Sequence, residues 1–221
     1  MDSRLRHLPI SMFSLILGLA GYAVATQRVF GYLGWSSRVT DVLLYVVTAF
    51  YVVLLVAYGL KVAIYRDAML AEFRHPVMIN FFPTITISLL LLSIAYVELN
   101  TPLSYGLWLA GAALNLILTL IILSSWMRHT RFEITHFSPA WFIPVVGNLI
   151  VPIVGVQHAP ADISWLFFAT GLVFAVALLV VFVYRMVFHQ PLHDRHLPTL
   201  FILIAPPAVA MIAYVKLTGA F

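Results

Sequence analysis

Small polar residues stand beside prolines inside long apolar stretches of this sequence, and these residue types could help an ion to cross a membrane. Asn80 and Thr84 flank Pro83, and Asn148 follows Pro144. Proline removes a backbone N–H and frees a carbonyl one turn earlier, which lipid does not tolerate but a water-filled cavity does. Amide and hydroxyl dipoles replace part of the hydration shell of an anion without trapping it. The pattern therefore favours a neutral pore for anions.

Ionisable side chains are missing from the middle of the apolar stretches. The exceptions are terminal groups such as Arg28, Lys61, Glu98 and Arg185. Proton relays, cation pumps and sodium-coupled carriers usually place ionisable groups near the bilayer midplane, so these classes find no support in the sequence. A proton-coupled carrier of dicarboxylates, or of oxyanions such as tellurite or sulfite, stays open as an alternative.

Motifs of common enzymes are absent as well. The sequence has no H-E-x-x-H, no G-x-S-x-G, no P-loop and no cysteine. His189, His193 and His196 faintly resemble the histidine boxes of membrane di-iron oxygenases, but Pro191 and Pro198 interrupt the helix that such a box needs. We therefore expect a solvated loop here, with no enzymatic activity, no metal site and no cofactor. A histidine-box membrane oxidase is kept as a further alternative, which metal analysis would settle.

The composition indicates an integral membrane protein. Hydrophobic residues make up 63% of the chain, charged residues make up 9%, and the mean hydropathy is +1.03. These stretches run without period-2 alternation and are long enough for helices, since about 20 residues cross the hydrocarbon core. The predicted architecture is all-α, with seven transmembrane helices at roughly 9–28, 40–61, 76–98, 102–127, 139–157, 162–185 and 198–217.

Four prolines reveal an internal repeat. Pro9, Pro76, Pro139 and Pro198 each open an apolar run just past a basic or histidine-bearing stretch, and they lie 67, 63 and 59 residues apart. A period near 60 residues fits a pair of membrane helices, so the repeat unit is a transmembrane helical hairpin. The seven helices then make three and a half hairpins.

Basic residues predict the orientation. The N-terminal tail and the second, fourth and sixth loops hold 9 of the 12 Lys and Arg residues, so the positive-inside rule places the N-terminus in the cytoplasm. A basic mouth there would concentrate anions, although the topology rule and anionic lipid also account for the charge. The predicted mouth residues are Arg6, His7, Arg74, His75, Arg195 and His196.

Odd-numbered and even-numbered spans differ in kind. The third, fifth and seventh spans carry internal prolines and small polar residues, whereas the interiors of the even spans are nearly free of proline. We expect proline-kinked inner odd helices around a central pore, with ordinary kinking between packed helices as the alternative for any single proline. The predicted pore-lining residues are Phe13, Ser14, Asn80, Pro83, Thr84, Pro144, Gly147, Asn148, Pro206 and Pro207.

Four groups of residues carry a resemblance to a known family. They are Leu8–Phe13 with Leu17–Ala20, His75–Val77 with Asn80–Pro83, Pro139–Asn148, and Ile204–Ala208. In these groups the sequence resembles the tellurite-resistance/dicarboxylate transporter family, which includes the plant guard-cell slow anion channels. The resemblance runs from about residue 7 to the end and is most specific around the third and fifth helices.

The resemblance implies ten helices in five hairpins, homotrimers with one pore in each subunit, and selective conduction of anions. It also implies a pore-plugging phenylalanine from a ninth helix, a role that no residue of this chain can take. We therefore expect residues 1–221 to be a single transmembrane domain that is an N-terminal fragment of a ten-helix domain. A shortened member that closes its pore by oligomerising is the alternative.

These observations lead to one functional expectation. We expect a multi-pass anion channel, or an anion-selective transporter, in a bacterial-type inner (plasma) membrane, in which small anions pass through a neutral pore lined by the odd helices. Its expected partners are small anions, the lipid bilayer and two further copies in a homotrimer. We expect no binding to nucleic acid.

Overall fold

The structure is a computed structural model that describes residues 4–128, 132–190, 192 and 194–219, with the side chains of residues 194–196 left aside. Within these residues every element is a helix, and seven helical stretches are long and apolar enough to cross a membrane. The prediction of an all-α protein with seven membrane-spanning helices is therefore confirmed. The spans are Ile10–Leu33, Arg38–Ile64, Met78–Tyr96, Thr101–Arg128, Pro139–His158, Ala161–Phe188 and Leu197–Thr218.

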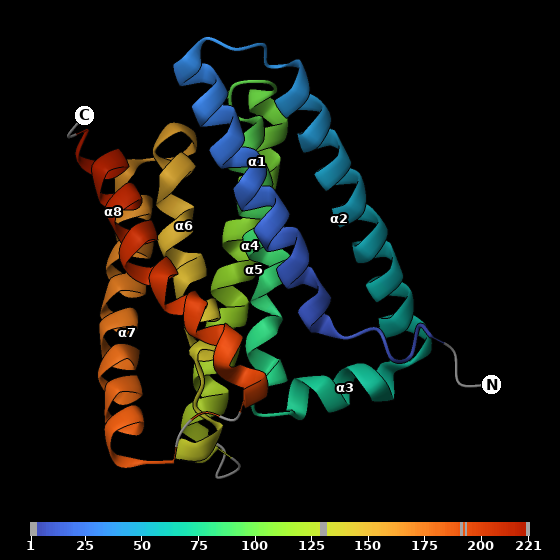
Figure 1. Ribbon diagram of the computed structural model, residues 1–221, viewed down its shortest axis with the longest axis vertical. Helices are drawn as coiled ribbons and strands as arrows, with labels where there is room; N and C mark the ends of the chain where they lie inside the picture. The colour runs from blue at the N-terminus through green and yellow to red at the C-terminus, as the bar shows by residue number, and fades with distance from the viewer. Residues whose placement is uncertain (1–3, 129–131, 191, 193, 220–221) are drawn as a thin grey trace.

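The three even spans are single long α-helices, because their interiors are apolar and lack proline. They are α2 (Arg38–Ile64), α5 (Thr101–Arg128) and α7 (Ala161–Phe188), of 27, 28 and 28 residues. Each is joined to the preceding span by a short connection, as the hairpin repeat predicts (Figure 1).

Each odd span instead begins with a 3-10 segment that changes into an α-helix. Pro83 opens α4, and Pro144 and Pro206 lie in the first turns of α6 and α8. The N–H groups of a first α-helical turn have no partner within their own helix, so proline fits there at little cost. The four pairs are η1 (Ile10–Met12) with α1 (Phe13–Leu33), η2 (Met78–Phe81) with α4 (Pro83–Tyr96), η4 (Pro139–Phe142) with α6 (Ile143–His158), and η5 (Asp194–Ile204) with α8 (Ala205–Thr218).

This arrangement refines the prediction of proline kinks. Pro83, Pro144 and Pro206, which sequence reasoning expects to kink the interiors of the third, fifth and seventh spans, lie where the 3-10 segment changes into the α-helix. Pro152 is different, because it lies in the interior of α6.

Burial separates the spans into layers. In the third and fifth spans 72% and 89% of the most apolar window is buried, against 22%, 33% and 33% in the three even spans. The first and seventh spans are only 28% and 11% buried. The expected inner position of the odd helices therefore holds for α4 and α6. By contrast, α1 and α8 are largely exposed, and they form the two sides of a groove that is open on one side.

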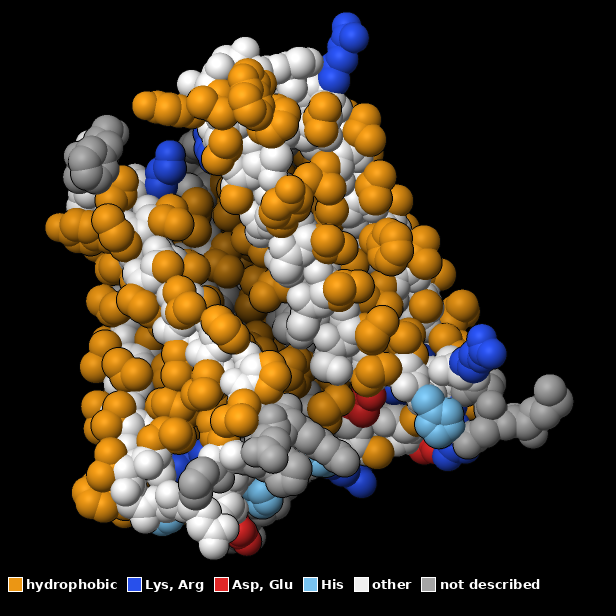
Figure 2. Space-filling model, viewed as in Figure 1, with side chains coloured by type: hydrophobic (Ala, Val, Ile, Leu, Met, Phe, Trp, Pro, Cys, Tyr) orange, Lys and Arg blue, Asp and Glu red, His pale blue; other side chains and the backbone are white. Residues whose placement is uncertain are grey.

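The two ends of the bundle carry different charges. At the end where the odd spans begin, the short helix α3 (Arg66–Arg74) lies across the bundle, and we call this end the basic end (Figure 1). Figure 2 shows charged and histidine side chains at the two ends, with a broad hydrophobic band between them. Arg28, Arg38 and Lys216 belong to the opposite end.

Candidate functional site

A groove with a volume of about 640 Å³ runs between the four odd spans. It lies between α1 and α8, with α4 and α6 forming its floor, and it is visible as the hollow at the centre of Figure 2. Its walls comprise Ser14, Leu17, Gly18, Phe81, Thr84, Ile87, Leu91, Ile143, Val146, Ile150, Pro198, Thr199, Phe201, Ile202, Ala205 and Val209.

The groove is apolar except for three hydroxyl groups. These belong to Ser14 on α1, Thr84 on α4 and Thr199 on η5, and no charged side chain belongs to the lining that the structure describes. Thr84 donates its hydroxyl proton to the carbonyl of Phe81. Ser14 Oγ is buried and has no hydrogen-bond partner among the described residues. A buried hydroxyl without a partner is costly, so a small shift of the wall that exposes Ser14 Oγ to the groove would give it a partner.

Two of the ten predicted pore-lining residues, Ser14 and Thr84, thus meet in this groove. Phe13 does not, because its ring is fully buried against Tyr51 and Tyr58 of α2, at centroid distances of 6.1 and 5.8 Å. The side chain of Asn80 is also buried outside the groove lining, and its Nδ2 donates to the carbonyl of Pro76 at 3.2 Å.

Gly147 and Asn148 face α5 and not the groove. Asn148 Oδ1 accepts from Asn115 Nδ2 at 3.1 Å, and Asn148 Nδ2 donates to Thr119 Oγ1 and to the carbonyl of Pro144, both at 3.3 Å. Gly147 permits this approach, since a Cβ there would lie 2.4 Å from Asn115 Oδ1. The amides therefore hold two helices together where sequence reasoning expects them to face an ion.

The same network reaches α4 and includes the proline carbonyls. Thr86 lies within hydrogen-bond distance of Asn115 Oδ1 at 3.0 Å and of the carbonyl of Pro83 at 2.9 Å. Thr119 donates to the carbonyl of Pro144 at 3.0 Å. Neither Pro83 nor Pro144 belongs to the groove lining. The carbonyl of Pro144 accepts its hydrogen bond from Thr119 of α5 and not from a ligand in the groove.

Pro206 and Pro207 lie in a different place from the groove. They line a smaller apolar pocket of about 200 Å³ between α7 and α8, together with Phe142 from η4. Their contacts are with hydrocarbon side chains, and the pocket offers almost no polar group.

The predicted basic-mouth residues lie around the basic end of the bundle. Arg6 forms an exposed ion pair with Asp67 at 3.0 Å, and His7 and Arg74 are exposed. His75 Nδ1 accepts from the backbone N–H groups of Val77 and Met78 at 3.2 and 3.3 Å, so this ring stabilises the start of the third span. The side chains of Arg195 and His196 lie outside the described residues.

The other lining residues of the groove were not among the predicted ones, and Thr199 is the polar residue of this set. Thr199 directly follows Pro198, as Thr84 directly follows Pro83, so the proline–threonine pair was a usable signal. The histidine-box alternative falls partly outside the described residues, which include neither His193 nor the side chain of His196. Among the residues that are described, no group of three or more His, Cys, Asp or Glu side chains could hold a metal ion.

Seven candidate membrane spans, four of which line one groove, define the class of multi-pass helical membrane proteins. The chain belongs to the voltage-dependent anion channel family SLAC1, whose profile matches residues 7–221. The family resemblance predicted from the proline-rich motifs is confirmed.

Relatives carry names of transporters, channels and resistance proteins. The chain is 27% identical to an uncharacterized transporter of Methanocaldococcus jannaschii, covering 99% of this chain and 68% of the relative. It is 27% identical to the S-type anion channel SLAH2 of Arabidopsis thaliana, covering 96% and 42%. It is 24% identical to a tellurite resistance protein TehA homolog of Haemophilus influenzae, covering 95% and 64%. The chain thus spans about two thirds of the length of the microbial relatives and less than half of the plant channel.

Proposed function

We propose that this protein is an anion channel or anion-selective transporter and that the groove between the four odd spans is the path of the anion. The observation that carries the proposal is the composition of the groove, in which Ser14, Thr84 and Thr199 supply hydroxyl groups and every other described lining residue is apolar or glycine. Membership of the SLAC1 family supports the same conclusion.

Hydroxyl groups suit this task for a physical reason. A Ser or Thr O–H can donate to an anion and replace part of its hydration shell, while a fixed positive charge in a low-dielectric wall would bind the anion tightly and slow its release. Ser14 Oγ has no hydrogen-bond partner among the described residues, and because the atom is itself buried, it would donate to an anion only after a local shift of the groove wall. Small anions therefore fit the groove better than cations, for which its wall offers no carboxylate.

The groove is open on one side, and an ion cannot cross beside lipid chains that offer it no polar group. We propose that further helices, and not lipid, cover the open side of the groove, in line with the prediction of a ten-helix domain. We further propose small anions and the bilayer as partners, the plasma membrane as the location and a cytoplasmic basic end. The homotrimer stays a prediction from the family resemblance.

The proposal is tested by reconstituting the protein in planar bilayers. We expect the reversal potential to follow an imposed chloride or nitrate gradient and to be unaffected by a pH gradient. A reversal potential that follows the pH gradient would contradict the neutral pathway and would favour the proton-coupled carrier. Cation-selective currents would overturn the proposal altogether.

A further inference from the structure

The four helices that line the groove also share a feature beyond it, at the end opposite the basic end. Three groove residues lie near the starts of their α-helices, namely Ser14, Thr84 and Ile143. Fourteen residues after each of them stands a polar residue, respectively Arg28, Glu98 and Gln157. Fourteen residues are close to four helical turns, so Arg28 and Gln157 lie about 21 Å farther along the same faces of α1 and α6, while Glu98 lies in the turn just past the end of α4 at Tyr96.

The fourth groove helix repeats the pattern. Ala205 and Val209 of α8 line the groove, and Lys216 lies at a shorter spacing, seven residues or about two turns after Val209 along the same face. All four odd spans start at the basic end, so they all end at the other end of the bundle (Figure 1). Helical register therefore brings Arg28, Glu98, Gln157 and Lys216 to one mouth of the groove.

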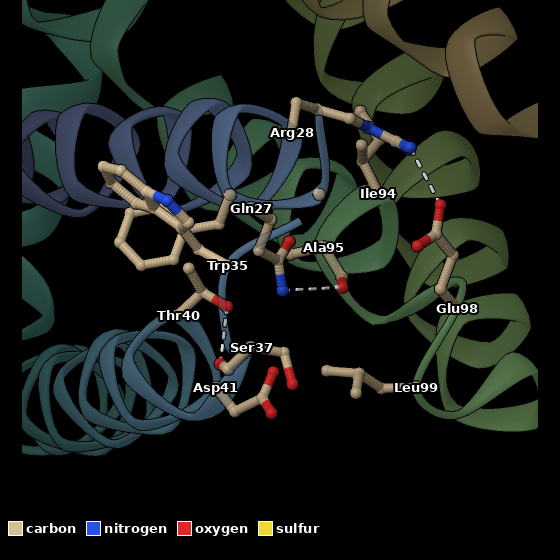
Figure 3. Close-up of a pocket in the computed structure, with 12 residues that line it drawn as sticks. Gln27, Arg28, Trp35, Ser37, Thr40, Asp41, Ile94, Ala95, Glu98 and Leu99 are labelled. Carbon is tan, nitrogen blue, oxygen red and sulfur yellow. Dashed lines mark hydrogen bonds and ion pairs between the residues drawn. The ribbon is translucent and has the colours of Figure 1, made fainter. Parts of the chain in front are cut away.

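Side-chain contacts support this placement for α1 and α4. Arg28 reaches across to Glu98, and Arg28 Nη1 lies 2.8 Å from Glu98 Oε1 (Figure 3). The pair also forms one wall of a pocket of about 160 Å³ that continues behind α1 toward Ser37 and Asp41 of the α1–α2 hairpin. Beside it, Gln27 Nε2 donates to the carbonyl of Ala95 at 3.4 Å and fixes the two helix ends together.

The exposure of the pair indicates what it can do. The side chains of Arg28 and Glu98 are 57% and 75% exposed, and such surface ion pairs contribute about 0–1 kcal/mol to stability. Their electrostatic effect on a passing ion is larger, because a charge at the mouth of a low-dielectric groove changes the local concentration of ions. In this pair Glu98 offsets the charge of Arg28, whereas Lys216 adds a second basic group on the opposite wall.

We propose, on the basis of the proposed function, that Arg28, Glu98, Gln157 and Lys216 form a polar collar that sets the concentration of small inorganic anions at this mouth of the groove. Lys216 attracts anions to the mouth. Glu98 offsets the charge of Arg28 and so limits the attraction. The anion concentration at the mouth is raised, but no anion is bound tightly there.

Ionic strength provides the test. The Debye length is about 30 Å at 0.01 M salt and about 3 Å at 1 M, so charges of the collar act on chloride at the mouth only in dilute salt. Single-channel conductance of the complete protein in planar bilayers would be compared in about 0.01 M and about 1 M potassium chloride for Lys216→Gln, Arg28→Gln and Glu98→Gln. Arg38→Gln is the matched control, because Arg38 is an exposed arginine at the same end but begins α2, which does not line the groove.

We expect Lys216→Gln and Arg28→Gln to lower the conductance about threefold in dilute chloride, and Glu98→Gln to raise it by a similar factor. All three should equal the wild type in concentrated salt. Arg38→Gln should also equal it there, and in dilute salt it should lower the conductance by a clearly smaller factor than Arg28→Gln, because α2 does not line the groove. The collar alone would be overturned if the wild-type protein conducts anions but the collar variants behave like Arg38→Gln in dilute chloride. A wild-type protein that passes no anions would overturn the proposed function and the collar with it.

Discussion

Gly147 allows two membrane helices to meet at the level of the asparagine network. A Cβ at this position would lie 2.4 Å from Asn115 Oδ1, so the Asn115 side chain would have to move away. We expect Gly147→Ala to lower the free energy of unfolding by about 1–3 kcal/mol, as overpacking does. The measurement is thermal unfolding of the purified protein in detergent.

Gly18→Ala is the matched control for that substitution. Gly18 also lies in a membrane helix, but a Cβ there meets no atom within 4 Å. Its unfolding temperature should equal that of the wild type. Equal stabilities of the Gly147→Ala and Gly18→Ala proteins would show that the close approach of Asn115 has no energetic importance.

Single residues also mark the limit of what the sequence could predict about the site. Ser14 and Thr84 were predictable because a small hydroxyl residue near a proline in an inner span is suited to a polar path. The role of Asn148 was not predictable in the same way, since its partner Asn115 lies 33 residues earlier, in an outer span. Whether a buried amide faces an ion or another amide depends on helix register, which one helix alone does not reveal.

At the scale of elements, a buried ion pair fixes α3 to the end of α2. Lys61 is 1% exposed, its Nζ lies 3.0 Å from Glu72 Oε2, and it also donates to the carbonyl of Leu8 at 2.8 Å. Tyr58 donates to the same Glu72 oxygen at 2.7 Å. Glu72→Ala would leave a buried ammonium group without its counter-charge, so we expect destabilisation of about 3 kcal/mol in thermal unfolding.

Asp67→Ala provides the comparison for Glu72→Ala. Asp67 lies on the same short helix and pairs with Arg6, but these side chains are 67% and 46% exposed. Its loss should cost less than about 1 kcal/mol. A Glu72→Ala protein as stable as Asp67→Ala would contradict the view that the buried pair anchors α3.

The change from 3-10 to α-helix at Pro83 is the second feature at this scale. Pro83 opens α4 and directly precedes Thr84 in the groove. Pro83→Ala restores an N–H and permits the α-helix to extend backward into η2, so we expect altered single-channel conductance with little loss of stability. Pro102→Ala, at the start of the outer helix α5, should change neither property. Unchanged conductance in Pro83→Ala would leave this proline a packing role only.

The spans themselves were predictable, whereas their first turns were not. Length, hydropathy and the proline repeat are properties of contiguous sequence, so all seven spans were located to within a few residues. In a 3-10 segment each N–H bonds to the carbonyl three residues earlier, whereas in an α-helix it bonds to the carbonyl four residues earlier. Which of the two patterns forms depends on the packing of the neighbouring helices. The sequence therefore indicated a bend near each proline but not that the prolines begin the α-helices.

At the scale of the whole molecule, the odd spans form the two sides and the floor of one groove. The contrast between proline-containing and proline-free spans predicted which helices approach the centre, and α4 and α6 lie there. The exposure of α1 and α8 depends on how all the helices are placed around the open side, which no local pattern encodes. Two of the predicted pore residues line the groove, Pro206 and Pro207 line a separate pocket between α7 and α8, and the others lie outside both linings.

The most direct test of the central claim places a cysteine in the groove of this cysteine-free chain. Thr84 and Thr86 are both buried, but Thr84 belongs to the wall of the groove, whereas Thr86, two residues later on α4, packs against Asn115 of α5. A charged, water-soluble methanethiosulfonate reagent applied during chloride recordings should block the Thr84→Cys current and leave the Thr86→Cys current unchanged. Modification of Thr84→Cys that leaves the chloride current intact would contradict the assignment of the groove as the anion path.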